Sequence, residues 1–271
     1  MTVEFHHHEI WSFISLAASL GVLLGHNFWV IAGQRRNEAL RIEAHVGHHF
    51  PHSESAILPE RIADFRLIST CGERLLGDGK VEGTALVTET ANTCSGATMT
   101  ALSLHPRSIT LAEKSFTKYI LEEDALAAVA ADFMPGVTTT EQREVYSKYA
   151  KAILATAHDE VVCRPVGQKM EIVPERNPVT MKPGERLPLR VLLDGEPISG
   201  VRVSSSCDQL AQGGYAAHTR TDADGRAAIA LPVAGHWFVR AHLIRRHLDA
   251  SVVQGAQWES FWPSLTFRME D

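Results

Sequence analysis

The chain has 271 residues, a formal net charge of -6 at neutral pH and 45% apolar residues. That length allows two modest domains with buried cores, and the mild acidity argues against nucleic acid as a partner. The chain also has 14 histidines. Because imidazole is a preferred ligand of borderline metal ions, this excess favours a role in metal handling.

Residues 1–25 predict a signal peptide or an N-terminal anchor. The run IWSFISLAASLGVLLG, residues 10–25, carries no charge. It is shorter than the roughly 20 residues of a transmembrane helix but has the length of a signal-peptide core. The preceding MTVEFHHHE lacks the Lys or Arg of a secretory signal. We expect cleavage after Gly25 and export, with a membrane-anchored chain as the alternative.

Cleavage after Gly25 would make His26 the first residue of the mature chain. Its α-amino group and its imidazole could then chelate one ion together. This arrangement suits Cu(II) or Ni(II), which favour nitrogen ligands in tetragonal geometry, and the amine has a pKa of about 8 that makes deprotonation accessible. His26 is therefore the first candidate metal ligand. Without cleavage it would offer only its ring.

Residues 39–46, ALRIEAHV, alternate apolar and polar side chains and predict a half-buried strand. The segment HVGHHFPH follows and places four candidate metal ligands in one turn region: His45, His48, His49 and His52. Such a cluster could buffer or deliver a metal ion. The adjacent pair would not both bind one ion, because neighbouring side chains diverge in extended backbone. A solvated loop is the alternative.

Short β-type runs separated by Gly and Asn fill residues 62–104 and contain two of the four cysteines. No CxxC pair occurs, which argues against a finger-type zinc site. If the protein is exported, Cys71 and Cys94 form the candidate disulfide, because a hairpin between them could bring their ends together. Closing that loop would stabilise the fold by roughly 3 kcal/mol. Buried free thiols are the alternative.

A small helical insertion is predicted at about residues 110–157. Thr110 and Glu113 have capping-box spacing and precede LAEKSFTKYILEEDALAAV, whose apolar residues recur at helical intervals. A Pro-Gly pair at 135–136 ends this helix. The segment EQREVYSKYAKAILATA predicts a second helix with a continuous apolar stripe.

From about residue 173 the chain predicts strands separated by turns, which is typical of an antiparallel sandwich. In HWFVRAHLI, strand parity places His242 on the polar face with His236 and Arg240. His242 is the second candidate ligand, and an exposed histidine without a role is the alternative. The tryptophans of WESFW are expected to pack the sandwich rather than to bind sugar.

Several segments resemble a family of bacterial periplasmic proteins that is described as a domain of unknown function and often as a nickel- or cobalt-uptake accessory. The resemblance rests on GEPISGVRVSSS, TDADGRAAIALPVAGHWFVRAHLIRR and QWESFWPSLTF, and it extends over about residues 26–269 through HNFWV, HVGHHF, FTKYILEEDAL, YSKYAKAIL and MEIVPERNP. It implies two β-domains, a periplasmic location and divalent-metal binding. Asn27 stands where an acidic residue is common in that family.

The sequence thus predicts a mainly β protein with two antiparallel, immunoglobulin- or transthyretin-like β-sandwich domains, at residues 26–172 and 173–271. We expect a periplasmic, non-enzymatic protein that binds nickel or cobalt, or alternatively copper, and assists a membrane metal-uptake transporter. Two alternatives stay open. One is a copper-dependent oxidative enzyme that uses an N-terminal histidine, and the other is a metal-free carbohydrate- or protein-binding module.

Overall fold

The computed structural model describes residues 27–34, 39–91, 94, 96–154, 160–210, 215–247 and 255–271. The expectations for residues 1–25 and for His26 therefore lie outside the described residues. Within the described ranges, no helix has the length and apolar character needed to cross a membrane.

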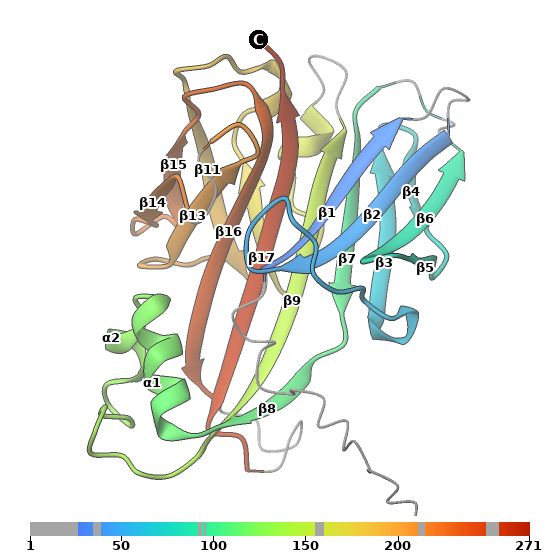
Figure 1. The fold of residues 1–271 in the computed structure, drawn as a ribbon. Coiled ribbons are helices and arrows are strands. Elements are labelled where there is room, and N and C mark those ends of the chain that lie inside the picture. Colours follow the sequence, from blue (N-terminus) through green and yellow to red (C-terminus); the bar gives the residue numbers. More distant parts are fainter. Residues whose placement is uncertain are drawn as a thin grey trace, which may run out of the picture.

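A nine-stranded sheet runs through the whole molecule (Figure 1). Its longest strands are β9 (Gln142–Leu154), β16 (Gly235–Arg246) and β17 (Trp258–Met269). The other strands are β3 (Ile62–Ser69), β4 (Gly72–Leu75), β7 (Thr98–Leu104), β8 (Arg107–Leu111), β13 (Arg202–Cys207) and β14 (Ala217–Arg220). The spatial order is β14-β13-β16-β17-β9-β7-β3-β4, and β8 also pairs with β9.

Two four-stranded sheets pack against this long sheet. The first contains β1 (Asn27–Gln34), β2 (Ala39–Gly47), β5 (Lys80–Glu82) and β6 (Ala85–Ala91). The second contains β10 (Met170–Pro174), β11 (Arg186–Leu193), β12 (Glu196–Pro197) and β15 (Arg226–Ala230). Each covers its own part of the long sheet with a separate apolar core. The predicted fold class, a mainly β protein built from antiparallel sandwiches, is confirmed.

Strand β2 shows why these segments form sandwiches. Leu40, Ile42 and Ala44 are buried, whereas the alternate residues Arg41 and Glu43 are partly exposed. Burying one face of such a strand removes apolar surface from water, and this stabilises the fold by about 25 cal/mol for each Å² buried. The predicted strand at residues 39–46 is therefore confirmed.

The second predicted helix is wrong. Residues 142–154 form β9, which pairs in parallel with β17 and antiparallel with β7. This central strand is buried on both faces from Glu144 to Ile153, so its sequence lacks the polar alternation of a half-exposed strand. The predicted insertion is correspondingly smaller, because helical structure there is confined to α1 (Glu113–Glu122) and α2 (Leu126–Val129) among the described residues.

The predicted capping box is also wrong. Thr110 lies in β8, and Ala112 occupies the N-cap of α1 without a side-chain cap. The carboxylate of Glu113 instead accepts hydrogen bonds from the Thr117 hydroxyl and the Gly136 backbone N–H, at 2.8 and 3.2 Å. The other helical segments among the described residues are the 3-10 turns η2 (Pro59–Arg61), η3 (Glu160–Cys163) and η4 (Pro178–Thr180).

The two predicted halves of the chain share one sheet. The expected boundary between residues 172 and 173 falls inside β10, and β17 pairs with β9 along ten consecutive positions, from Trp258 to Phe267. Side chains from both halves can therefore meet across the β9–β17–β16 strands.

Candidate functional site

Buried polar side chains gather where α1 covers the ends of β9, β16 and β17 (Figure 1). This polar cluster consists of Tyr119, Glu123, Glu144, Lys148, Arg240, His242, Ser260 and Trp262. The strand register brings its members together, because Lys148 of β9 stands opposite Trp262 of β17. Burying so many ionisable groups is costly unless they are paired, and such clusters are typical of functional sites.

His242 is the predicted ligand that the structure places in this cluster. Its Nε2 lies 2.8 Å from the Tyr119 hydroxyl, and its ring centre lies 4.1 Å from that of Trp262. Its Nδ1 lies 3.9 Å from a carboxylate oxygen of Glu123. Burial lowers the pKa of His242 to about 4, so the ring is neutral at pH 7. The alternative of an exposed histidine is wrong, because α1 covers this face of β16.

Arg240 and Glu123 form a buried ion pair beside His242. One guanidinium nitrogen of Arg240 donates to both carboxylate oxygens of Glu123, at 2.9 and 2.7 Å. Burial raises the pKa of Glu123, but the charge of Arg240 and the hydrogen bonds from it oppose the shift, and the net pKa lies below the ordinary value. Glu123 is therefore ionised at neutral pH.

The end of α1 is held on the sheet by two more arginines. Arg202 of β13 donates to the carbonyl oxygen of Glu122 at 2.8 Å, and Arg220 of β14 donates to that of Asp124 at 2.9 Å. Cations at a helix C-terminus satisfy its free carbonyl groups and interact favourably with the helix dipole. These contacts fix the position of Tyr119 over β16.

Glu144 and Lys148 form the β9 side of the cluster. Burial raises the pKa of Glu144 to about 7, while hydrogen bonds from Ser260 and Tyr119 oppose the shift. Burial, with the charge of Arg240 as the next cause, lowers the pKa of Lys148 to about 7. The ammonium nitrogen of Lys148 lies 5.8 Å from the ring centre of Trp262. Both groups thus change charge near neutral pH.

Asn27, the first described residue, connects the N-terminal strand to this cluster. Its side-chain N–H donates to the carbonyl oxygen of His48 at 2.8 Å, and its side-chain oxygen accepts from the Tyr215 hydroxyl at 2.9 Å. The ring of Tyr215 in turn lies 4.5 Å from the guanidinium carbon of Arg240. The start of β1 is therefore fixed between the His48 turn and the polar cluster.

The structure does not bring the four histidines of HVGHHFPH together. His45 is buried against the Trp29 ring at 5.6 Å, and burial lowers its pKa. His48, His49 and His52 are exposed, and Nδ1 of His48 lies 2.7 Å from the carboxylate of Glu54. In the ranges that the structure describes, no three His, Cys, Asp or Glu side chains form a group that could hold a metal ion.

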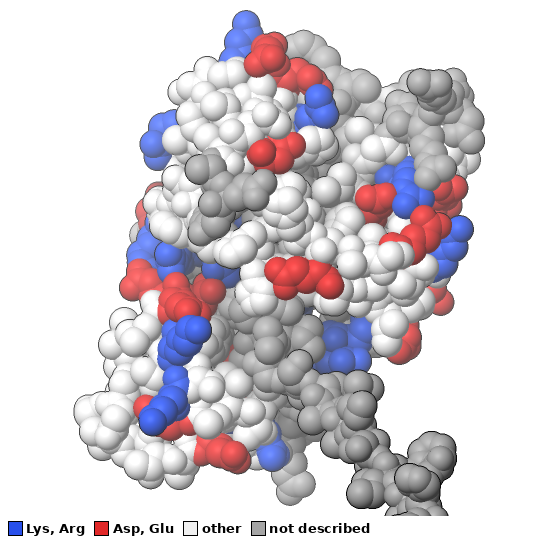
Figure 2. Space-filling model, viewed as in Figure 1, with Lys and Arg blue, Asp and Glu red and all other residues white. Residues whose placement is uncertain are grey.

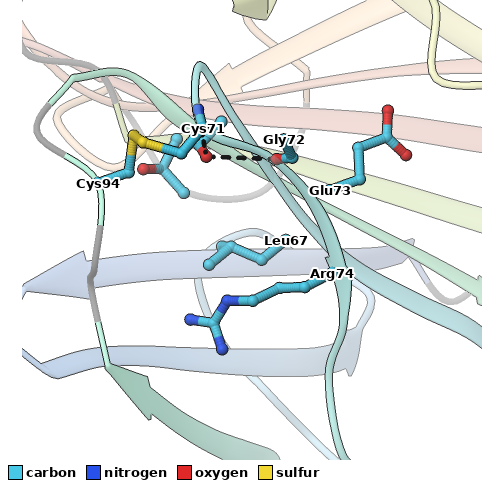
Figure 3. A pocket seen from close by; sticks show the side chains of 8 residues that line it. Leu67, Cys71, Gly72, Glu73, Arg74 and Cys94 are labelled. Carbon is cyan, nitrogen blue, oxygen red and sulfur yellow. Dashed lines mark hydrogen bonds between the residues drawn. A yellow bond between two sulfur atoms is a disulfide. The ribbon is translucent and has the colours of Figure 1, made fainter.

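Cys71 and Cys94 form the disulfide named in the sequence analysis, with their Cα atoms 6.0 Å apart. It ties the β3–β4 turn to the segment before β7 and borders a small cavity of about 190 Å³, into which Leu67 and Arg74 project (Figure 3). Cys163 and Cys207 are free thiols. The cavity has no cluster of reactive groups comparable to the polar cluster.

The part of the surface that the structure describes presents no tryptophan to a sugar ligand. The tryptophans within the described part of the chain, Trp29, Trp237, Trp258 and Trp262, are all buried, and Trp258 stacks on Phe116 at 5.7 Å. The large hydrophobic side chains exposed there are aliphatic or Met. Lys, Arg, Asp and Glu side chains are interspersed on the face shown in Figure 2. The expectation that the WESFW tryptophans pack the interior is therefore confirmed.

Four members of the polar cluster were not predicted from the sequence: Tyr119, Glu123, Glu144 and Lys148. The signal was present in the run QREVYSKYAKAIL of β9, because Glu144 and Lys148 lie an even number of residues apart. Interpreted as a strand, that run places both charges on one face. Nothing local to α1 indicated that Tyr119 would face His242, 123 residues later.

Fold and cluster together define a mainly β protein with a buried polar site on the central strands of its long sheet, where α1 covers them. Residues 23–245 match the family described as Domain of unknown function (DUF4198), and the chain belongs to this family. No curated protein matches it. Among solved structures, it is similar to the D0-D1 domain of intimin over 88% of this chain and 97% of that chain, with 10% identity and a TM-score of 0.21. That likeness is too slight to inform the site.

Proposed function

We propose that the protein is exported to the periplasm, binds a divalent nickel or cobalt ion, and passes it to a membrane uptake transporter. The observation that carries the proposal is the buried, neutral imidazole of His242 beside Glu123. A chain of contacts leads from Glu123 to the start of β1 through Arg240, Tyr215 and Asn27. A neutral imidazole is the form that binds metal ions.

His26 is the residue expected to complete the site. It precedes Asn27 by one peptide bond, and Asn27 is held by two hydrogen bonds beside the cluster. After cleavage at Gly25, an amine and an imidazole would begin the chain next to this point. Nitrogen ligands of this kind suit Ni(II), Co(II) and Cu(II). Because the described residues do not by themselves form a three-ligand group, the proposal requires this contribution.

The Cys71–Cys94 disulfide supports the proposed location. Disulfides persist in oxidising compartments such as the bacterial periplasm and are rare in the cytosol. The copper-enzyme alternative would use the same two histidines, and redox turnover with a reductant would distinguish it from a carrier. The metal-free carbohydrate-binding module is the weaker alternative. Such a module needs exposed aromatic side chains, whereas the large hydrophobic side chains exposed on the described part of the chain are aliphatic or Met.

Mass spectrometry of the exported protein tests the proposal. The full precursor is expressed with its own leader, and the exported chain is measured under denaturing and native conditions. We expect a mature chain that begins at His26 and carries one nickel or cobalt ion. His242→Ala should lose that ion, whereas the matched control His52→Ala, at an exposed histidine, should keep it. A chain that retains residues 1–25, or a His242→Ala variant with full metal content, would contradict the proposal.

A further inference from the structure

We infer that Tyr119 is a positioning residue that holds the proton of His242 on Nε2 and so leaves Nδ1 as the nitrogen that can bind an ion. The part concerning the ion rests on the proposed function. The part concerning the proton stands on hydrogen-bond geometry within the polar cluster alone.

The direction of the hydrogen bonds begins at Trp262. An indole N–H can only donate, and Nε1 of Trp262 donates to the Ser260 hydroxyl oxygen at 2.8 Å. The Ser260 hydroxyl then directs its own proton to Oε1 of Glu144. Oε1 therefore acts as an acceptor in this network.

The Tyr119 hydroxyl has a single proton, and its polar neighbours are Glu144, His242 and the Ser260 hydroxyl, whose own proton is directed to Glu144. Oε1 of Glu144 lies 3.3 Å away and Nε2 of His242 lies 2.8 Å away. Oε1 accepts when Glu144 is ionised. It also accepts when Glu144 is protonated, because the proton can then reside on Oε2, a buried atom with no hydrogen-bond partner in the described structure. Tyr119 consequently donates to Glu144 and accepts from His242, which requires a proton on Nε2.

The other nitrogen of the ring has no comparable partner. The nearest charged oxygen to Nδ1 belongs to Glu123, at 3.9 Å, which is too long for a hydrogen bond. That carboxylate is already bound by Arg240 through both oxygens. Within the described part of the chain nothing holds a proton on Nδ1, so its lone pair is left available.

This arrangement matches the chemistry of metal-binding histidines. Such histidines usually donate their second ring N–H to an acceptor, which fixes the tautomer and the ring orientation and raises the basicity of the ligating nitrogen. The Trp262 ring at 4.1 Å further restricts rotation of the imidazole. Tyr119, supported by Glu144, would therefore act on the ion only through His242.

Nitrogen-15 NMR of the metal-free, labelled protein tests the inference. The ring-nitrogen shifts of His242, assigned by their loss in His242→Ala, should report the Nε2–H tautomer in the wild type. In Tyr119→Phe the tautomers should mix, and nickel affinity should fall by about 10- to 100-fold, as for other losses of an outer-shell partner. Tyr149→Phe is the control, because Tyr149 is a buried tyrosine that belongs to a different core. It should change neither the tautomer nor the affinity.

The outcomes separate the two claims. A wild-type His242 with its proton on Nδ1 would overturn the inference, and this measurement needs no variant to fold. A Tyr119→Phe protein with the wild-type tautomer and affinity would overturn it as well. If the wild type binds no nickel or cobalt but the tautomer changes as expected in Tyr119→Phe, the positioning role is supported and the proposed function fails.

Discussion

The side-chain oxygen of Asn27 accepts a hydrogen bond of 2.9 Å from the hydroxyl of Tyr215, joining residues 188 positions apart. Because the Tyr215 ring also lies over Arg240, this bond ties the beginning of β1 to the cluster around His242. The N-terminal strand and the C-terminal half of the chain thus meet where we propose that the ion binds.

Tyr215→Phe should weaken nickel binding by loosening this connection. Removing one hydrogen bond costs roughly 1 kcal/mol, which corresponds to about a fivefold loss of affinity. Calorimetric titration of the mature chain would measure it, with Tyr149→Phe as the control for loss of a buried hydroxyl elsewhere. Equal affinities of Tyr215→Phe and the wild type would show that the bond does not position the N-terminus.

Glu123→Ala should strongly destabilise the fold, because it leaves the guanidinium of Arg240 buried without its partner. Breaking a buried ion pair in this way costs about 3–5 kcal/mol. The neighbouring Asp124→Asn is the control, since its pair with Arg220 is exposed and worth less than about 1 kcal/mol, and Asn tolerates the positive φ of 53° at this position. Urea unfolding of both variants makes the comparison. Similar losses of unfolding free energy in the two variants would mean that the buried ion pair stabilises the fold no more than the exposed one.

Glu144→Gln should change how stability depends on pH. The pKa of Glu144 rises from 4.5 in the unfolded chain to about 7 in the fold. Below pH 4.5 the carboxyl is protonated in both states, and above about 7 the fold must bury a charge. The stability that this group contributes to the wild type therefore falls by about 3 kcal/mol as pH rises from about 4.5 to about 7, and changes little above that.

The amide of Glu144→Gln cannot ionise, so its unfolding free energy should not show this decrease with pH. Glu144→Asp keeps a titratable carboxyl, and its unfolding free energy should still decrease as pH rises. Unfolding free energies at pH 5 and pH 8 measure the difference. A wild type and a Glu144→Gln variant with parallel profiles would argue against a raised pKa at this position.

Replacing Cys71 and Cys94 together by serine should lower stability by roughly 3 kcal/mol, because the bond closes a loop across a sequence separation of 23. Adding a reductant should bring the wild type down to the level of the double variant, which should itself not respond. Thermal or urea unfolding with and without reductant is sufficient. A wild type that is indifferent to reductant would show that the disulfide contributes little.

Much of the fold could be predicted because the alternation of apolar and polar side chains along a strand can be recognised from neighbouring residues alone. Leu40 and Ile42 share one face of β2, and this pattern fixed both the strand and its buried side. The error at β9 has an equally simple cause. Val145, Tyr149 and Ile153 are spaced by four, and four is both one helical turn and an even number, so the same residues form a helix stripe and one face of a strand. Only the pairing with β17 decides between the two.

The candidate site was harder to predict because it depends on distant parts of the chain. The composition pointed to histidine, and His242 was chosen from strand parity. Its burial could not be foreseen, since it depends on Tyr119 and the docked end of α1. The turn histidines show the opposite case. They are close in sequence, yet His45 is buried against Trp29 while His48 is exposed.

The most direct test of the account is a calorimetric titration of nickel into a chain that begins at His26. We predict one ion per chain, and His26→Ala or His242→Ala should each lose at least the roughly 10- to 100-fold that an outer-shell change costs. A chain that begins one residue earlier, at Gly25, keeps the imidazole but moves the terminal amine, and it should bind as weakly as His26→Ala. Undiminished binding of nickel, cobalt and copper by all three altered chains would contradict the account.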